Sequence, residues 1–488
     1  MLVLNGTHLS LDELVSAVRS HEAVSLSAEA RERVNRSREQ AVDAASRRDV
    51  YGRTTGVGAN KTAAIAKDDS EHAMRLLRSH AIDAGPFQPA DRVRAALIVR
   101  LSQLAAGGSG VAIEIVDALA AMISANALPA VRRWGAIGTG DLHAFAATAL
   151  TLAGERPTVT GMDAPVFKTW TAHDALPFIS SNALTLGRAA LSLARLDAQR
   201  QAALVVAALS CRAMSGNLEA FDHRVAAAAG SDGAEAVAAA MRTLTEGSGS
   251  QARIQDPYCL RAIPVLYAPL WDEAAHLRRT IELQISAPQE NPLIVSAGDT
   301  SGRGDVAHNA SFFASVLAHR LDSLRLAVAE PLALAVRRIT LLHDPAFTGR
   351  DRFLAEGPSG SSGLMMHEYV AASALATARA AATPSALDSV VLSLGAEEDA
   401  SFSTASVDQL EQQLDATAVI LAAEWMSAVR ALRQQGVTPS DLVSPLLRMA
   451  LTQGNELGTD DHDADLDARL DAAIRRVESL GAAGHGAS

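Results

Sequence analysis

Four long stretches in the second half of the chain carry apolar side chains at helical spacing: residues 263–285, 310–343, 363–382 and 406–434. Alanine recurs along them, and this small side chain allows neighbouring helices to approach closely. The pattern restricts the chain to a mainly α fold built around a bundle of long helices. We expect residues 1–195 to form a mixed N-terminal domain. Residues 196–488 should form the bundle and the core of an oligomer.

Composition narrows the possible classes of partner. The 488 residues are 48% hydrophobic, 20% charged and 4% aromatic, which is typical of a folded, alanine-rich helical protein. The formal net charge is -12 and basic residues are scattered, so we expect no nucleic-acid partner. Apolar runs such as residues 202–209 are too short to span a bilayer, so we expect no membrane partner.

The cysteines and the spacing of metal-binding residue types indicate where the protein is located and whether it binds a metal. Cys211 and Cys259 are the only cysteines, so no disulfide framework is expected and a reducing cytoplasm is the default location. The first six residues lack the basic region and long apolar run of a signal peptide. Neither HExxH nor CxxC spacing occurs, so we expect no metal site.

The stretch 134–142 concentrates three glycines directly before a helix-like run that ends at Gly154. Asp141 is a residue type that commonly caps a helix N-terminus, and glycine commonly ends a helix. The tripeptide Gly138-Thr139-Gly140 therefore lies directly before a helix N-terminus, where backbone N–H groups favour negative charge. A tight turn that uses glycine only for its backbone freedom is the simpler interpretation of this stretch alone.

Several further segments together resemble one family, the aromatic amino acid ammonia-lyases and aminomutases, with histidine ammonia-lyase the nearest member. The segments that carry the resemblance fall in the family's order: residues 51–58 (Tyr-Gly-Arg-Thr-Thr-Gly-Val-Gly), 79–81, 108–111, 255–261 (Gln-Asp-Pro-Tyr-Cys-Leu-Arg), 290–293, 344–349 and 397–399. The resemblance covers essentially the whole chain. It implies a long-helix bundle of the fumarase/aspartase-like type, and a homotetramer whose active sites are each assembled from several subunits.

The resemblance also implies a cofactor made from the backbone. Enzymes of this family cyclise and dehydrate an Ala-Ser-Gly tripeptide to methylidene-imidazolone (MIO), an electrophile that binds the substrate amine and makes nitrogen a better leaving group. Gly138-Thr139-Gly140 stands at that position, so a MIO-type group formed from these residues is implied, with Thr139 as its reactive centre. Threonine would leave an ethylidene in place of a methylidene, with a methyl group on the carbon that the amine attacks.

Three residues would perform the chemistry if the family's roles carry over. Tyr51 would be the base that removes the substrate β-proton, and Tyr258 would line the site and help polarise the cofactor. Arg261 would hold the substrate carboxylate as a bidentate fork, a geometry that lysine does not reproduce. Taken alone, such a tyrosine is more often a packing residue, and such an arginine is more often part of a structural ion pair.

Other residues would bind the substrate. His80 and Glu398 would contact its side chain, which favours a polar or imidazole group over a plain phenyl. Ser180 stands where the family has an asparagine that helps to form and hold the cofactor, and Asn182, two residues on, is a possible substitute. His80 could equally be a core histidine and Glu398 a surface charge. Arg53 suggests an additional anionic group on the substrate, or a surface charge.

Three hypotheses stay open at this point. The first is an ammonia-lyase or aminomutase that acts on an α-amino acid through a MIO-type group. The second is an enzyme of the same fold that works without this group and uses Tyr51 in another elimination, dehydration or rearrangement. The third is a catalytically silent helical scaffold, against which the retention of Tyr51 and Arg261 argues.

Overall fold

The computed structural model describes residues 1–66, 69–249, 251–296, 304–458 and 465–482. The chain divides into two compact units, each made of three segments. Unit 1 comprises Met1–Ala194, Leu277–Leu321 and Pro384–Val407, and unit 2 comprises Arg195–His276, Asp322–Thr383 and Asp408–Ser488. The division into domains at residues 1–195 and 196–488 stays a prediction.

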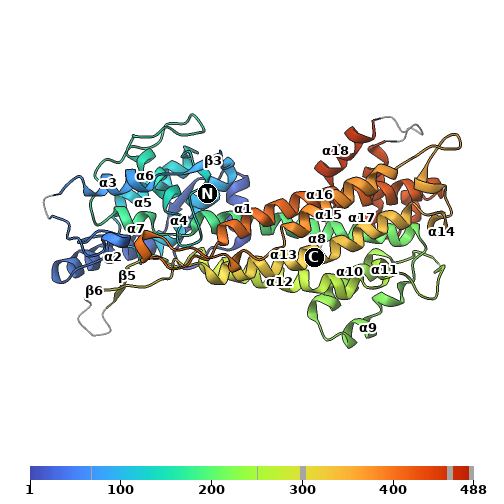
Figure 1. The fold of residues 1–488 in the computed structure, drawn as a ribbon, viewed down its shortest axis with the longest axis horizontal. Helices are drawn as coiled ribbons and strands as arrows, with labels where there is room; N and C mark the ends of the chain where they lie inside the picture. The colour runs from blue at the N-terminus through green and yellow to red at the C-terminus, as the bar shows by residue number, and fades with distance from the viewer. Residues whose placement is uncertain (67–68, 250, 297–303, 459–464, 483–488) are drawn as a thin grey trace. The chain divides into compact units, whose positions relative to one another are not determined.

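Unit 1 mixes helices with short strands (Figure 1). Its elements are β1 (Leu2–Leu4), α1 (Leu11–Arg19), β2 (Val24–Leu26), α2 (Ala28–Arg47), η1 (Gly58–Asn60), α3 (His72–His80), β3 (Ala84–Phe87), α4 (Ala90–Ala105), α5 (Ile113–Ser124), β4 (Arg132–Trp134), α6 (Leu142–Leu152), α7 (Ala175–Ile179), β5 (Leu293–Ser296), β6 (Gly304–Ala307), η4 (Ser385–Leu387) and η5 (Ser393–Gly395). The strands form three two-stranded sheets: β1 pairs in parallel with β2, while β3 with β4 and β5 with β6 are antiparallel.

Unit 2 is helical among its described residues. Its shorter elements are η2 (Leu218–Phe221), α9 (His223–Ala228), α10 (Asp232–Leu244), α11 (Tyr258–Arg261), α14 (Pro345–Thr348), η3 (Arg352–Leu354), α15 (Met365–Ala380), η6 (Pro439–Asp441), α17 (Pro445–Glu456), α18 (Leu466–Val477) and α19 (Ser479–Ala482). Four long helices contribute residues to both units: α8 (Ala183–Ala213), α12 (Ile263–Gln284), α13 (Ser315–Leu342) and α16 (Ser403–Gln434).

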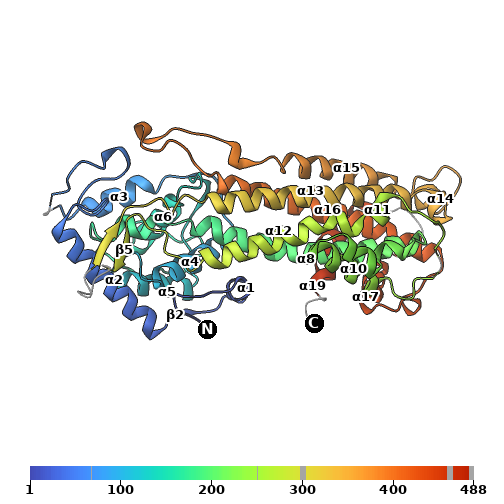
Figure 2. The same ribbon diagram turned by 90° about the horizontal axis from the view of Figure 1, so that it is seen from below.

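Long helices are therefore the dominant element, and the expected mainly α fold is confirmed (Figure 2). All four predicted stretches are helical over most of their length, in α12, α13, α15 and α16. The largest difference is at α13, which begins at Ser315 because residues 310–314 form a turn and an extended segment. The extended segment contacts residues 138–140, since the Ala314 N–H donates to the Gly138 carbonyl.

A fully buried ion pair joins the long helices within unit 2. Arg338 on α13 binds Glu424 on α16 through two hydrogen bonds, Nε to Oε1 at 2.6 Å and Nη2 to Oε2 at 2.9 Å. Ser210 donates to the same carboxylate at 2.7 Å, and the Tyr267 hydroxyl accepts from Arg338 at 3.1 Å. Since neither charged side chain is exposed, each depends on the other for its stability in the core.

The described residues contain no helix that is both long and apolar enough to cross a bilayer. Within the same residues, no group of three or more histidine, cysteine or acidic side chains is arranged to hold a metal ion. Cys211 and Cys259 are both free, buried thiols.

Candidate active site

Residues 138–140 form an irregular link between β4 and α6 in unit 1. Gly138 and Gly140 have φ values of +85° and +111°, a region that side-chain-bearing residues rarely adopt. Both glycines are buried, while Thr139 is half-buried. The Thr139 hydroxyl makes no hydrogen bond within the described chain.

Three hydrogen bonds hold this tripeptide. The carbonyl oxygen of Gly138 accepts from Ser401 Oγ at 2.7 Å and from the Ala314 N–H at 3.1 Å. The N–H of Gly140 donates to Asn182 Oδ1 at 3.0 Å, and Asn182 Nδ2 donates in turn to the Phe312 carbonyl at 2.5 Å. Ser401 and Asn182 are 4% and 0% exposed, so these bonds are shielded from water.

Asp141 occupies the N-cap position of α6, but its side chain does not cap the helix. The carboxylate instead accepts from the Thr185 N–H at 2.8 Å and the Thr185 hydroxyl at 2.9 Å, while the Asp141 N–H donates to the Ser181 carbonyl at 2.6 Å. Burial raises the pKa of this fully buried carboxyl, and the hydrogen bonds from Thr185 oppose the rise. The expected cap is therefore wrong at the level of the side chain, because Asp141 ties α6 to α8.

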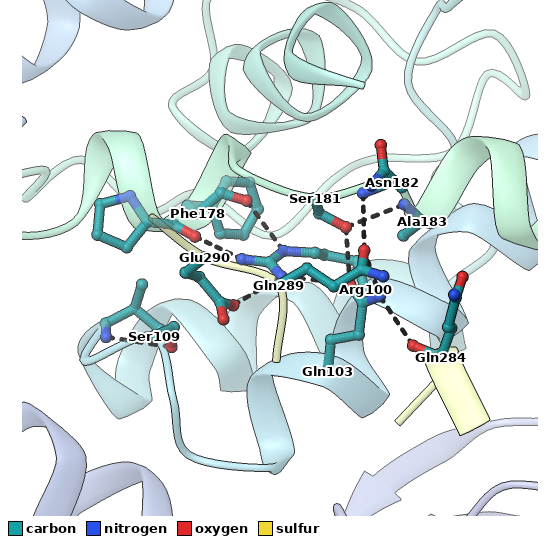
Figure 3. A network of polar contacts seen from close by, with 12 residues as sticks. Arg100, Gln103, Ser109, Phe178, Ser181, Asn182, Ala183, Gln284, Gln289 and Glu290 are labelled. Carbon is teal, nitrogen blue, oxygen red and sulfur yellow. Dashed lines mark hydrogen bonds and ion pairs between the residues drawn. The ribbon is translucent and has the colours of Figure 1, made fainter. Parts of the chain in front are cut away.

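A buried polar network positions the segment that carries Asn182 (Figure 3). Arg100 on α4 binds Glu290 at 2.9 Å and donates to the carbonyls of Phe178, at 3.0 Å, and Pro177. The Gln289 side chain accepts from the Asn182 N–H at 3.2 Å. Burial lowers the pKa of Arg100 and raises that of Glu290, and the charge of each opposes the shift of the other.

Tyr51 lies in a tight loop that ends at η1. Its hydroxyl accepts a hydrogen bond from the Gly58 N–H at 2.7 Å, and its own N–H donates to His308 Nε2 at 3.3 Å. Gly52 has a φ of +69°, and a Cβ at this position would lie closer than 3.0 Å to Leu176 Cδ2. The loop therefore needs glycine beside Tyr51 to keep the phenol in place.

Tyr258 and Arg261 lie in unit 2, on the single turn α11. The Arg261 guanidinium stacks over the Tyr258 ring at 4.6 Å from its centroid. With its amide oxygen facing the guanidinium, Gln255 accepts from Arg261 Nη1 at 3.0 Å and from Nη2 at 3.3 Å. Asp256, which is 3% exposed, accepts from Arg253 Nε at 2.6 Å and from the Asn217 N–H at 2.6 Å, and so anchors the turn.

Residues 9–453 match the family model described as aromatic amino acid lyase. The chain belongs to this family. It is 32% identical over 452 residues to the histidine ammonia-lyase of Symbiobacterium thermophilum, and the match covers 88% of each chain. The expected ammonia-lyase-like enzyme is thereby confirmed.

Two solved structures share the aromatic amino acid lyase fold. The phenylalanine aminomutase of Pantoea agglomerans has a TM-score of 0.91 at 21% identity, over 98% of this chain and 99% of that one. The ergothioneine-degrading ergothionase of Treponema denticola has a TM-score of 0.90 at 23% identity, over 98% of this chain and 99% of that one. At these identities the likeness shows the fold.

The structure of this aromatic amino acid lyase brings some of the predicted site residues together. Asn182 contacts Gly140, whereas the Ser180 side chain makes no hydrogen bond to the described residues. His80 ends α3, where its Nδ1 contacts the Leu76 carbonyl at 2.9 Å, and Glu398 is exposed. The substrate-binding roles of Ser180, His80 and Glu398 stay predictions.

One part of the site has no counterpart in the sequence interpretation, and Arg53 differs from what the sequence suggested. Ser401 and the Ala314 N–H reach Gly138 from segments far along the chain, which no local spacing reveals. Arg53 is 2% exposed and donates to the carbonyls of His173, at 2.8 Å, and Ser109. Arg53 is therefore neither a surface charge nor a free anion-binding group, because its donors stabilise buried loops.

Proposed function

We propose that this chain cleaves a carbon–nitrogen bond of an α-amino acid or a close derivative. It would act as a lyase, or as a mutase that returns the nitrogen to the neighbouring carbon. Tyr51 removes the β-proton, Arg261 holds the carboxylate through paired hydrogen bonds, and Tyr258 lines the site. The observation that carries the proposal is the Tyr51 hydroxyl, which is half-buried and accepts the Gly58 N–H at 2.7 Å, a bond that favours the phenolate.

The surroundings of Tyr51 indicate what the base still needs. Burial raises the pKa of Tyr51 above its ordinary value, the Gly58 N–H lowers it, and the negative charge of Glu397 raises it. A phenol with a raised pKa is a strong base once ionised, but a positive charge must lie close to it if it is to ionise near neutral pH. Arg261 from another subunit, or the cationic nitrogen of the substrate, supplies such a charge.

The proposed assembly is a homotetramer with shared sites. One subunit contributes Tyr51 and the tripeptide 138–140, and a second contributes Tyr258 and Arg261. His80 and Glu398 contact the substrate side chain, with Ser180 and Asn182 on the side of the tripeptide. A histidine and a carboxylate in these positions favour an imidazole or another polar group on the substrate.

The residues at 138–140 do not fit the family's MIO group. A Cβ on Gly138, as in the family's alanine, would lie closer than 3.0 Å to Ser401 Oγ and to the N and Oγ of Ser403. The φ of +85° at this residue is also unsuited to alanine. Thr139 would add a methyl group to the carbon under attack, where it hinders addition of an amine. The proposed chemistry therefore uses no such group.

The test is to incubate the enzyme with aromatic α-amino acids, both free and N-methylated, and to follow the conjugated unsaturated acid by its absorbance and the β-amino acid by chromatography. Wild type should form one of these products, and Tyr51→Phe should lose about 100-fold or more of the rate. Tyr369→Phe is the matched control, because Tyr369 is an exposed tyrosine on α15. Full turnover by Tyr51→Phe would overturn the proposal.

A further inference from the structure

The three hydrogen bonds at residues 138–140 belong to a linear peptide. Closing the tripeptide into an imidazolone joins the Gly140 nitrogen to the Gly138 carbonyl carbon, expels the Gly138 oxygen as water and removes the Gly140 N–H hydrogen. Ser401 and the Ala314 N–H would then lose their acceptor, and Asn182 Oδ1 would lose its donor. A buried polar group without a partner destabilises the structure that contains it, so the surroundings stabilise the open chain.

Gly138 and Ser401 fit each other in a way that also favours the open chain, and we call them a matched pair. The missing Cβ of Gly138 leaves the space that Ser401 Oγ occupies, and Ser401 uses this space to donate to the Gly138 carbonyl. Two donors on a carbonyl would, by themselves, assist attack on its carbon. The attacking nitrogen, however, is held by Asn182 in a hydrogen bond that exists only while Gly140 keeps its hydrogen.

An amine is a poor leaving group, and the family's electrophile improves it by binding the nitrogen. An enzyme without this electrophile needs another way to make nitrogen leave. The α-ammonium of a free amino acid is a stronger acid than a phenol, whose pKa is about 10. A Tyr51 phenolate would therefore take the N–H proton before the much weaker β-C–H acid, and the neutral amine that remains is a poor leaving group. A trialkylammonium group carries no N–H proton, and it leaves as a neutral tertiary amine.

The charge near Tyr51 suits such a substrate. Glu397 and Glu398 are exposed carboxylates in the segment that follows η5, and the Ala59 N–H of η1 donates to Ser393 Oγ of η5 at 3.0 Å. The negative charge of Glu397 raises the pKa of Tyr51 and so disfavours its phenolate. A fixed positive charge beside the phenol offsets this effect at every pH, whereas a primary amine loses its charge when it is deprotonated.

Resting on the proposed function, we propose that residues 138–140 remain an ordinary peptide and that the substrate is an N,N,N-trialkylated α-amino acid. The Tyr51 phenolate takes the β-proton, and the C–H electron pair becomes the second bond between Cα and Cβ. The Cα–N bond breaks and its electrons leave with nitrogen. The products are an α,β-unsaturated carboxylate, a neutral trialkylamine and protonated Tyr51, which returns its proton to water.

The experiment compares two sets of probes on the full-length wild-type enzyme: histidine, phenylalanine and tyrosine, and the trimethylammonium betaine of each. Ammonia and trimethylamine are measured separately, and the intact mass of the same sample is recorded. We expect trimethylamine from at least one betaine, at least 100-fold faster than ammonia from its parent amino acid. The mass should equal that of the unmodified chain.

The outcomes separate this inference from the proposed function. A mass lower by two waters overturns the linear tripeptide, and Tyr51-dependent ammonia release from a free amino acid overturns the substrate class. In both cases the proposed carbon–nitrogen lyase stands. If neither set of probes gives an unsaturated acid or a rearranged amino acid, the proposed function itself is contradicted. An unmodified mass in that experiment would still support the linear tripeptide.

Discussion

Gly138→Ala is the substitution that most sharply probes the surroundings of the tripeptide. An alanine at a φ of +85° carries a conformational strain of about 1–2 kcal/mol. The new Cβ would also lie closer than 3.0 Å to Ser401 Oγ, so Ser401 must move and its bond to the Gly138 carbonyl, worth about 0.5–1.5 kcal/mol, is lost. Adding these two terms, we expect the free energy of unfolding to fall by about 1.5–3.5 kcal/mol.

Urea unfolding, followed by circular dichroism, measures this loss. Gly154→Ala is the matched control, because Gly154 has a φ of +80° but its Cβ would meet only Val166 Cγ1, at 3.9 Å. The control should therefore show the strain of about 1–2 kcal/mol without the contribution of the clash. The difference between the two variants measures the contacts of the new Cβ with Ser401 and Ser403.

A double-mutant cycle with Ser401→Ala completes the test. Ser401→Ala removes the atom that lies closest to the new Cβ and leaves the contacts with Ser403. The double variant should therefore be more stable than the sum of the two single effects predicts, by at least about 1 kcal/mol. Additivity within about 0.5 kcal/mol would show that Ser401 does not meet the Cβ, and would refute the matched pair.

Three other predictions concern the rest of the molecule. Glu424→Ala leaves Arg338 buried without its partner, so the free energy of unfolding in urea should fall by about 3–5 kcal/mol. A decrease below about 1 kcal/mol would contradict the contribution of the buried pair. Burial lowers the pKa of His367 to about 4, against about 6.5 in the unfolded state, so the unfolded state binds more protons between these values. Stability should therefore rise as the pH increases across this window, by up to about 1.4 kcal/mol per pH unit. His367→Leu should reduce this slope, and an unchanged slope would refute the account. Co-expression of inactive Tyr51→Phe and Arg261→Ala chains should restore part of the activity in mixed tetramers, since some sites then combine intact residues; no recovery in confirmed mixed tetramers would contradict shared sites.

The long helices could be predicted from the sequence because their signal is local. Apolar side chains that recur with a helical period identify α12, α13, α15 and α16 without knowledge of any distant contact. The motif order likewise predicted the family, since Tyr51 and Arg261 each stand in a matching segment.

The surroundings of residues 138–140 could not be predicted, because long-range contacts decide them. Ser401 reaches Gly138 from 263 positions along the chain, and no spacing rule pairs the two. The sequence could not show whether Ser180 or Asn182 contacts the tripeptide. The backbone turn after α7 places Asn182 against Gly140. Asp141 shows the limit of a local rule, since its carboxylate binds Thr185 in place of the helix N-terminus.

The central claim is that Tyr51 removes the β-proton as the carbon–nitrogen bond breaks. A substrate deuterated at the β-carbon tests it most directly, with the amine released by wild type and by Tyr51→Phe as the readout. The account predicts slower release from the deuterated substrate with wild type, and a loss of about 100-fold or more in Tyr51→Phe. Equal rates with both substrates, together with full turnover by Tyr51→Phe, would contradict it.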